Sequence, residues 1–392
     1  FKVEADAYWR SLNNNAKCSG LDNNSVSKLS EVIPWLQHNA MIHYTKPYGL
    51  EQYSGAAWGS RDVCQGPVEL LLAFGKTEPV KRVVLEVYKH QYEQNGEWPQ
   101  WFMFDKFSDI QQAHAHGDII VWPLKAVCDY VEYSNDLSIL DEKIPYTNIE
   151  GFEFTDKEET LFDHINKELD HIRNAFVGDT KLISYGDGDW NDSLQPHDPE
   201  MKDKLVSVWT VELLYQTLTR YQVVCEKAGK TELASELKAT CAQMKKDFNH
   251  YLVKDDLTAG FAFFNSEDDV DLLLHPTDTK TGVKYRLLPA IRGIISEIFE
   301  PEQAEAHYQM IQDKLLFKDG VHLMDPPPQY TGGISKSFQR AETATFVGRE
   351  IGNHYVHAHL RYMEAMAKLG KAEELLTAME VVNPVNIQDS FD

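Results

Sequence analysis

The sequence predicts an all-α domain in which helix hairpins close into a toroid. Three observations predict this fold: apolar residues recur at helical spacing over most of the chain, the connections between these stripes are long, and no Ser/Gly linker or low-complexity tract divides the chain. The 392 residues are 43% hydrophobic and 25% charged, which is typical of a globular protein and excludes a disordered or fibrous chain. No precise repeat supports a solenoid, so a closed toroid is favoured.

The clearest helical stripe follows Thr155 and ends near Gly178. Its apolar residues recur at three- and four-residue steps: Leu161, Phe162, Ile165, Leu169, Ile172 and Phe176. Thr155 and Glu158 match the T-x-x-E capping box that marks the start of a helix. We therefore expect this helix to begin just after Thr155.

Two further stripes follow each other closely and predict an antiparallel helix hairpin. Their apolar residues are Val211, Leu214, Leu218, Tyr221 and Cys225 up to Gly229, and then Leu233, Leu237, Cys241, Met244, Phe248 and Tyr251. Shorter helical patterns cover 2–13, 67–74, 79–93, 117–133, 297–315 and 354–369, with Gly370 as a helix C-cap. Convincing strands are few, and the segment from Phe261 to Phe264 is the best candidate.

Long polar or aromatic loops separate the predicted helices. They cover residues 44–66, 94–116, 178–202, 253–290 and 318–345. Loops of this length are uncommon in a compact domain and usually carry function. We therefore expect the functional residues on loops at one end of the toroid.

The charge balance excludes some partners. Lys and Arg number 38 against 61 Asp and Glu, which gives a net charge of −23. Phosphate backbones and anionic membranes attract Lys and Arg, so nucleic acid and membrane surfaces are not expected partners. No stretch approaches the length of apolar sequence that a membrane helix needs. One small anion in a locally basic pocket stays compatible with this charge.

The cysteines and the first residues bear on location. Five cysteines are an odd number and show no C-x-x-C spacing, so a disulfide framework or zinc knuckle is not expected and a reducing compartment, the cytoplasm, is favoured. The chain begins with Phe1, without an initiator Met or a signal-peptide apolar region. We expect it to be a fragment of a longer protein.

Segment 184–198, SYGDGDWNDSLQPHD, crowds carboxylates into a Gly-rich turn beside Trp190. Three interpretations stay open. The segment can be an acidic turn without a function, or a calcium loop, although Asp192 stands where the EF-hand loop has Gly. It can also be a sugar site, because a carboxyl group in a partly dry pocket can donate a proton to a leaving oxygen. Trp190 would then be the platform on which a sugar ring stacks.

Segments 47–67 and 94–122 carry further candidates. Arg61 and Asp62 follow Trp58 and form either a loop ion pair or a clamp for sugar hydroxyls. Segment 94–122 combines aromatic residues with His114, His116 and Asp118. This cluster is interpreted as core, as a saccharide groove with His116 and Asp118, or as a metal site built on the His-x-His pair.

Segment 349–359, REIGNHYVHAH, brings cations and a carboxylate to the start of the last strong helix. Arg349, His354 and His357 could form a cationic pocket for an anion at a helix N-terminus. A metal site of His354, His357 and His359 is the rival interpretation, and any of these histidines could be a core residue.

Four blocks together resemble one known family. HYTKPYGLEQYSGAAWGSRDVCQGP, HAHGD, GDGDWNDSLQP and GREIGNHYVHAH occur in order between about residue 35 and residue 392. They resemble the glycoside phosphorylases of glycoside hydrolase family 94, and within that family the 1,2-β-oligoglucan phosphorylases. The resemblance implies an (α/α)6 barrel. It also implies an inverting reaction, in which inorganic phosphate cleaves a β-linked gluco-oligosaccharide, best matched by β-1,2-glucan oligomers, to α-glucose 1-phosphate and a shortened oligosaccharide.

The resemblance also implies residue roles. Asp192, the last residue of Trp-Asn-Asp, falls on the general acid, and Trp190 falls on the subsite of the transferred glucosyl unit. Arg61 and Asp62 match the Arg-Asp pair that binds the hydroxyls of that sugar.

Two more positions match residues near the reaction centre. Glu350 falls on the family's Glu, and His357 falls on the His that faces phosphate. With Arg349 we expect His357 to bind phosphate, and we expect Trp58, His116 and Asp118 to join the sugar site.

The chain departs from the family pattern at two places. Residues 55–58 are Gly-Ala-Ala-Trp, where members that act on disaccharides carry another Arg. The chain ends at Asp392, before the small-residue loop that completes the phosphate site, and the N-terminal β-sandwich domain is absent. We expect residues 1–392 to be an (α/α)6 catalytic domain from a longer multidomain enzyme, with a barrel incomplete at its C-terminus.

A phosphorylase needs an acid but no base, because phosphate is already an anionic nucleophile. We expect oligosaccharide and phosphate as partners and no metal or other cofactor, and a homodimer is compatible with the sequence. Asp192 must carry a proton, so its site should be low in dielectric or near another carboxylate, and Asp189 and Asp187 are candidates for that neighbour. Two alternatives stay open: an inverting β-glucan hydrolase with Glu350 or Asp62 as base, and a catalytically silent carbohydrate-binding fragment.

Overall fold

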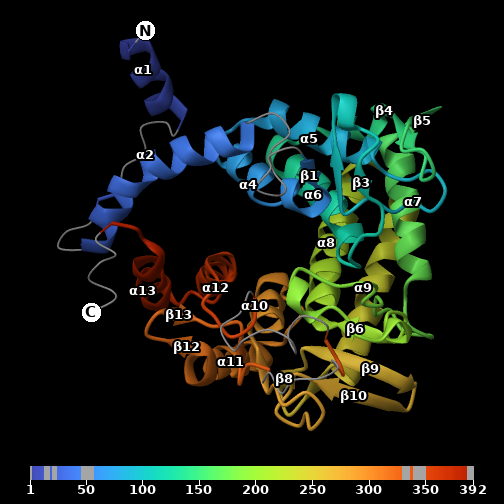
Figure 1. Cartoon of the computed structure of the whole chain (residues 1–392), viewed down its shortest axis with the longest axis vertical. Helices are drawn as coiled ribbons and strands as arrows, with labels where there is room; N and C mark the ends of the chain where they lie inside the picture. Colours follow the sequence, from blue (N-terminus) through green and yellow to red (C-terminus); the bar gives the residue numbers. More distant parts are fainter. Residues whose placement is uncertain are drawn as a thin grey trace.

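The computed structural model describes residues 2–12, 18–19, 24–45, 57–328, 336–338 and 350–385. Helices dominate it (Figure 1). The α-helices are α1 (Lys2–Leu12), α2 (Asn24–Thr45), α3 (Ser60–Val63), α4 (Gly66–Ala73), α5 (Thr77–Lys89), α6 (Trp122–Ser134), α7 (Leu161–Asn174), α8 (Val208–Lys227), α9 (Thr231–Tyr251), α10 (Leu287–Ser296), α11 (Pro301–Met310), α12 (Val356–Lys368) and α13 (Ala372–Val382).

Helices α4, α6, α8, α10 and α12 form an inner row, in which α6, α8, α10 and α12 each pack against the helix before them in the row. Helices α5, α9, α11 and α13 pack against the members of this row that neighbour them in sequence. Every residue of α10 is buried, whereas Ala378 is the buried residue of α13. The row is therefore the inside of the domain, and the partner helices form its outer layer.

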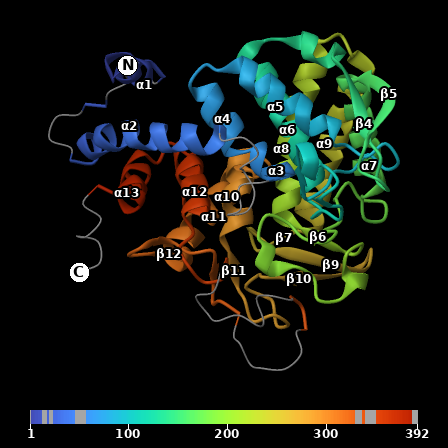
Figure 2. The same ribbon diagram turned by 45° about the horizontal axis from the view of Figure 1, so that its top comes forward.

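An ion pair joins the two ends of the inner row. Arg361 of α12 donates from Nη2 to both carboxylate oxygens of Glu69 on α4, at 2.9 and 2.8 Å. Figure 2 shows α2 passing over the end of α13, and α1 packs against α2 at the edge of the molecule. The described helices thus curve around a common interior.

Short strands lie in the connections between the helices. They are β1 (Ala57–Gly59), β2 (Trp101–Met103), β3 (Gln111–Gln112), β4 (Lys143–Thr147), β5 (Phe154–Thr160), β6 (Leu205–Ser207), β7 (Val253–Lys254), β8 (Leu257–Thr258), β9 (Phe261–Ser266), β10 (Asp269–Leu273), β11 (Tyr285–Arg286), β12 (Leu316–Phe317), β13 (Gly320–Val321) and β14 (Met324–Asp325). Among the described residues they pair into two three-stranded sheets, β1-β2-β3 and β10-β9-β6, and four two-stranded ribbons. These strands pair antiparallel, with Trp58 opposite Phe102 and Val206 opposite Ala262.

The prediction of a mostly helical domain is confirmed, and the prediction of few strands is wrong. The hairpin is confirmed as α8 and α9, and the strand at Phe261 is confirmed as β9. Many of the strands are only two or three residues long, which is too short for an apolar–polar alternation to be recognised in the sequence. Helix α10 shows no apolar stripe because it is buried on all sides.

The start of α7 was predicted too early. Thr155 and Glu158 lie in β5, and the capping box is formed by Thr160 and Asp163. Thr160 Oγ1 accepts from the Asp163 N–H at 3.2 Å, and Asp163 Oδ2 accepts from the Thr160 N–H at 3.1 Å. The helix therefore does begin at a capping box, with a short polar side chain followed three residues later by an acid. This box lies five residues after the predicted one. No helix among the described residues is long and apolar enough to cross a membrane.

His307 of α11 is a buried histidine that the fold keeps neutral. Its ring stacks on Phe299 at 4.1 Å, and Nε2 accepts from the Thr258 N–H at 3.0 Å. Nδ1 therefore carries the proton and donates to the Gln303 carbonyl at 2.7 Å. Burial lowers the pKa of His307 to about 4.

The free energy of unfolding should therefore decrease as the pH falls from about 6.5 toward about 4, because the unfolded chain takes up a proton that folded His307 excludes. This contribution is complete above the unfolded pKa and is lost below it. In urea titrations, His307→Gln should reduce the slope of the free energy of unfolding against pH by up to about 1.4 kcal/mol per pH unit in this range. The exposed His250 is the control, and equal pH slopes in wild type, His307→Gln and His250→Gln would contradict the expectation.

Candidate active site

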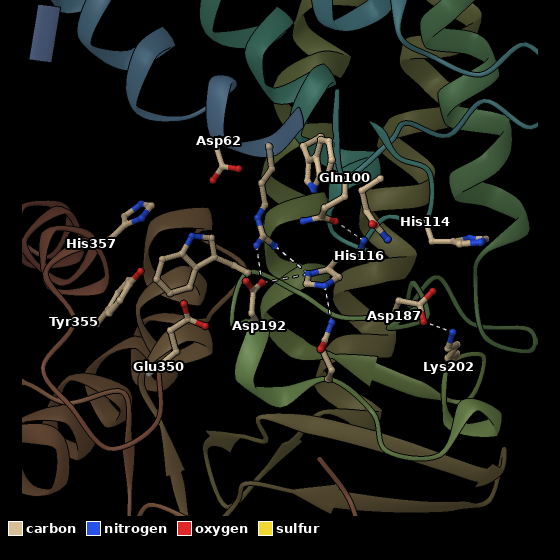
Figure 3. A pocket seen from close by; sticks show the side chains of 15 residues that line it. Asp62, Gln100, His114, His116, Asp187, Asp192, Lys202, Glu350, Tyr355 and His357 are labelled. Atoms are coloured by element: carbon tan, nitrogen blue, oxygen red, sulfur yellow. Dashed lines mark hydrogen bonds and ion pairs between the residues drawn. The ribbon is translucent and has the colours of Figure 1, made fainter. Parts of the chain in front are cut away.

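All four segments singled out in the sequence meet at one cavity of about 660 Å³. Figure 3 shows Asp192 and His116 near its middle, His357, Tyr355, Asp62 and Glu350 toward one side, and Asp187 and Lys202 toward the other. The lining residues are Arg61, Asp62, Gln100, Trp101, Gln112, His114, His116, Asp187, Trp190, Asp192, Gln195, Lys202, Glu350, Tyr355 and His357.

Arg61 connects three parts of the site. It lies on α3 directly after β1 and is 6% exposed. Nη1 donates to Asp118 Oδ1 at 3.2 Å and to the Asp189 carbonyl at 3.0 Å, and Nη2 donates to Asp192 Oδ1 at 2.7 Å. Burial acts to lower the pKa of Arg61, but the charges of Asp118 and Asp192 raise it above its ordinary value. The guanidinium is therefore a permanent cation.

Asp189 anchors the Gly-rich loop and does not line the cavity. Its carboxylate is fully buried; Oδ2 accepts from Arg286 at 2.8 Å and from Ser207 Oγ at 2.6 Å. Oδ1 accepts from the Asn191 N–H at 2.8 Å. These contacts fix the backbone just before Asp192.

Gly188 allows this loop to lie against His116. Its φ is +152°, and a Cβ there would stand 3.1–3.2 Å from the His116 ring. The Gln195 side-chain amide lies 2.8 Å from His116 Nε2. When that amide donates, Nδ1 carries the ring proton and faces the Asp189 carbonyl at 3.2 Å and Asp192 Oδ1 at 3.4 Å.

Asp192 begins a short 3₁₀ turn, Asp192–Leu194, whose N-cap is Asn191. Asn191 Oδ1 accepts from the Ser193 N–H at 3.1 Å, which fixes the direction of the turn. Of the two carboxylates expected beside Asp192, Asp189 pairs with Arg286 and Asp187 pairs with Lys202. Arg61 stands beside Asp192 instead, and this contact favours the ionised carboxylate.

Glu350 is connected to the same turn through the backbone. Asn191 Nδ2 donates to the Glu350 carbonyl at 3.0 Å. Glu350 is 4% exposed and has a φ of +57°, a left-handed conformation that is uncommon for a residue other than glycine. Such a conformation persists where the surroundings determine it, and it is frequent at functional sites.

His357 stands in the first turn of α12, beside Trp190. The two rings meet edge to face at 4.8 Å and 88°. Burial, followed by the charge of Arg361, lowers the pKa of His357 to about 4. The expected cationic histidine is therefore neutral near neutral pH in this structure. Its ring can still donate one hydrogen bond to an anion.

Most predicted site residues line the cavity, and two do not. Those that line it are Arg61, Asp62, His116, Trp190, Asp192, Glu350 and His357. Trp58 lies in β1 and packs edge-on against Phe104 at 5.1 Å. Asp118 is fully buried and accepts from Arg61 and from Trp122 Nε1, so it can position Arg61 but does not reach a ligand in the cavity. Arg349 lies outside the described residues.

Five lining residues were not named as candidates or had no role assigned: Gln100, Gln112, Gln195, Lys202 and Tyr355. Gln195 lies in the Trp-Asn-Asp block, so its position in that block was the available signal. Gln100 accepts from the His116 N–H at 2.8 Å and thereby holds that backbone next to the cavity.

The metal interpretations receive no support from the described residues. Within them, no group of three or more His, Cys, Asp or Glu is placed to hold a metal ion. The proposed calcium ligands Asp187 and Asp189 belong to separate ion pairs. His359 is a core residue: its Nδ1 accepts from the Val321 N–H at 3.3 Å, and Nε2 donates to the Ala378 carbonyl at 2.9 Å.

Carboxylates and aromatic rings thus surround one guanidinium in a cavity of a helical domain. The model of the Glycosyl hydrolase 94 superfamily, catalytic domain, matches residues 8–392, and the chain belongs to this superfamily. It is 44% identical to the 1,2-β-oligoglucan phosphorylase of Listeria innocua over 93% of the chain. The match covers 33% of that relative, so the chain spans about a third of its length.

A more distant relative and a solved structure are also similar to the chain. The cyclic β-(1,2)-glucan synthase NdvB of Rhizobium meliloti is 24% identical over 98% of the chain and 14% of its own length. A solved glycosidase variant in complex with glucose superposes with a TM-score of 0.56 and 13% identity, over 93% of this chain and 85% of that one. This second likeness shows the fold alone.

The buried Arg286–Asp189 pair should contribute strongly to stability. Arg286→Met would leave the Asp189 carboxylate buried without its cation, and we expect a loss of about 3–5 kcal/mol in the free energy of unfolding by urea. The matched control is Lys280→Met, which breaks the exposed pair with Asp271 and should cost about 0–1 kcal/mol. If both variants lose a similarly small amount of unfolding free energy, the buried Asp189 carboxylate does not need the charge of Arg286.

Proposed function

We propose that the protein is an inverting glycoside phosphorylase that cleaves β-linked gluco-oligosaccharides, with β-1,2-glucan oligomers as the preferred substrates. Inorganic phosphate is the co-substrate, and α-glucose 1-phosphate and a shortened oligosaccharide are the products. The family and the Listeria relative support the reaction, and the two relatives named for β-1,2-glucans support the linkage. The observation that carries the proposal is the meeting of Asp192, Glu350 and His357 in one cavity.

In the proposed step, one phosphate oxygen forms a bond to the anomeric carbon while the bond from that carbon to the acceptor oxygen breaks. The electron pair of the broken bond stays on the acceptor oxygen, which takes a proton from Asp192. Phosphate approaches from the opposite face, where His357 lies, so the configuration inverts. General acid assistance of this kind contributes about 10²–10⁴-fold to rate.

Asp192 can act as acid only when its contact with Arg61 is exchanged for the substrate. In this structure the ion pair of 2.7 Å holds the Asp192 carboxylate in place. Sugar hydroxyls accept from guanidinium groups, so a bound glucosyl unit competes for Arg61. Once Arg61 binds the sugar, Asp192 loses its positive neighbour, takes up a proton from water and presents it to the glycosidic oxygen.

The other side chains bind the two substrates. Trp190 is the platform for the transferred glucosyl ring, and Arg61, Asp62, His116 and Glu350 bind its hydroxyls. Phosphate lies against His357, with Arg349 as a further ligand. Trp58 and Asp118 support this site from behind. No base, metal or other cofactor is required, because phosphate is already a nucleophile.

Fold and location complete the proposal. The inner row and its partner helices support an (α/α)6 barrel for the catalytic domain of residues 1–392. The five cysteines are free thiols, which supports a reducing compartment, and we place the enzyme in the cytoplasm. A homodimer stays a prediction.

Asp192→Asn should lower kcat for phosphorolysis by at least about 10²-fold, because the amide cannot deliver the proton. Oligosaccharide binding measured by calorimetry should persist. An aryl β-glucoside, whose leaving group needs no proton, should lose less activity than the natural substrate. The control is Asp179→Asn, the same change at an exposed position of the same connection.

Turnover near wild type in Asp192→Asn would contradict the role of Asp192. Release of free sugar in phosphate-free buffer would contradict the phosphorylase and favour an inverting hydrolase, with Glu350 or Asp62 as base. Sugar binding without turnover in the wild type, with and without phosphate, would favour a catalytically silent binding protein.

A further inference from the structure

The cavity is a poor site for phosphate in its present charge state. Four described lining residues carry carboxylates: Asp62, Asp187, Asp192 and Glu350. Among the described lining residues, the arginine and lysine side chains are Arg61 and Lys202, and each is in an ion pair with one of these carboxylates. His357 is neutral near neutral pH. A doubly charged anion beside His357 therefore needs a cation from outside this lining.

A second cavity of about 380 Å³ adjoins the first and supplies such a cation. It shares Asp62 and His357 with the main cavity, and its wall includes Arg361, Glu69 and Gln65. Arg361 follows His357 by one turn of α12, so the two side chains lie on the same helix face. In Figure 3, Asp62 and His357 lie on the side of the main cavity away from Asp187 and Lys202.

We infer that Arg361 is a phosphate-binding residue, which exchanges its contact with Glu69 for inorganic phosphate held between Arg361 and His357. This inference rests on the proposed phosphorolysis and adds a second cation, besides Arg349, to its phosphate subsite. A guanidinium suits the role because its two parallel N–H donors match the oxygens of a phosphate group.

The network around Glu69 allows Arg361 to move. Lys125 Nζ lies 3.4 Å from Glu69 Oε1, so this carboxylate keeps a cation when Arg361 turns away. The other partner of Arg361 is Glu364, which is 43% exposed, and a pair of that kind contributes about 0–1 kcal/mol. Exchange therefore leaves no buried carboxylate without a positive neighbour.

A second arginine adds positive potential behind the subsite. Arg292 of α10 is 4% exposed and, with His357, Trp190 and Arg361, borders a small gap under the main cavity. Arg292 Nη1 donates to the neutral side chain of Gln216, at 3.0 Å. Arg292 and Arg361 together offset the carboxylates that surround the reaction centre.

Two substitutions with opposite effects test the inference. Arg361→Gln removes the cation and should raise the KM for inorganic phosphate by about 10- to 100-fold, the range expected for hydrogen bonds to a charged group. Glu69→Gln removes the competitor and should lower that KM. The KM for the oligosaccharide should change by less than about twofold in both variants. If the Arg361–Glu69 pair only holds α4 and α12 together, both substitutions should change the KM for phosphate in the same direction. That result would overturn the inference.

Further variants separate folding from binding. Arg361→Lys keeps a charge beside Glu69 but loses the paired donors, so its KM for phosphate should fall between wild type and Arg361→Gln. Arg173→Gln and Glu236→Gln break an exposed pair between α7 and α9 and serve as matched controls that should leave both KM values unchanged. An unchanged KM for phosphate in Arg361→Lys and Arg361→Gln would also overturn the inference.

Calorimetry with inorganic phosphate distinguishes failure of the inference from failure of the proposed function. Phosphate binding that weakens in Arg361→Gln and tightens in Glu69→Gln supports the subsite even if the wild type shows no phosphorolysis. The opposite result is also informative. If the wild type carries out phosphorolysis but neither substitution changes the affinity for phosphate, the proposed reaction is supported and the role of Arg361 is refuted.

Discussion

The guanidinium of Arg61 is the contact on which the site depends. It stands at the end of a short strand and holds the Asp118 carboxylate, the Asp189 carbonyl and the Asp192 carboxylate at once. Asp189 is fixed in turn by Arg286 and Ser207, and Asn191 ties the same turn to the Glu350 backbone. Four segments that are far apart in sequence therefore share one network of charged hydrogen bonds. The bonds of Arg61, Arg286 and the Asp189 carboxylate are stronger than neutral ones, because at least one partner is ionised.

The second constraint is that an acidic protein must hold an anion next to its carboxylates. The carboxylates bind sugar hydroxyls well because each oxygen accepts hydrogen bonds, but the same charges repel phosphate. The proposed roles separate the two tasks. Asp192 and His116 lie near the middle of the cavity and His357 lies on one side, where it also lines the smaller cavities that Arg361 and Arg292 border. The ion pair with Glu69 neutralises Arg361 until an anion competes for it.

The sequence predicted the helical domain and the segments that form the site better than it predicted the contacts of individual side chains. Blocks such as Gly-Asp-Gly-Asp-Trp-Asn-Asp combine unusual residues at short range, so their local chemistry is visible without a structure. Which aspartate anchors the loop and which faces the cavity depends on Arg286, almost a hundred residues away, and no local pattern contains that contact. Trp58 shows the same limit, since its packing partner comes from the neighbouring strand segment. The two-residue strands and the fully buried α10 leave no periodic signal at all.

The central claim is a single displacement at the anomeric carbon, with Asp192 on one face and phosphate on the other. Proton NMR of the sugar phosphate, recorded early in phosphorolysis of a β-1,2-linked oligoglucan, tests this claim most directly. A single displacement gives the α anomer of glucose 1-phosphate as the first product. The β anomer as first product would require two displacements through an enzyme-bound intermediate, and it would contradict this account.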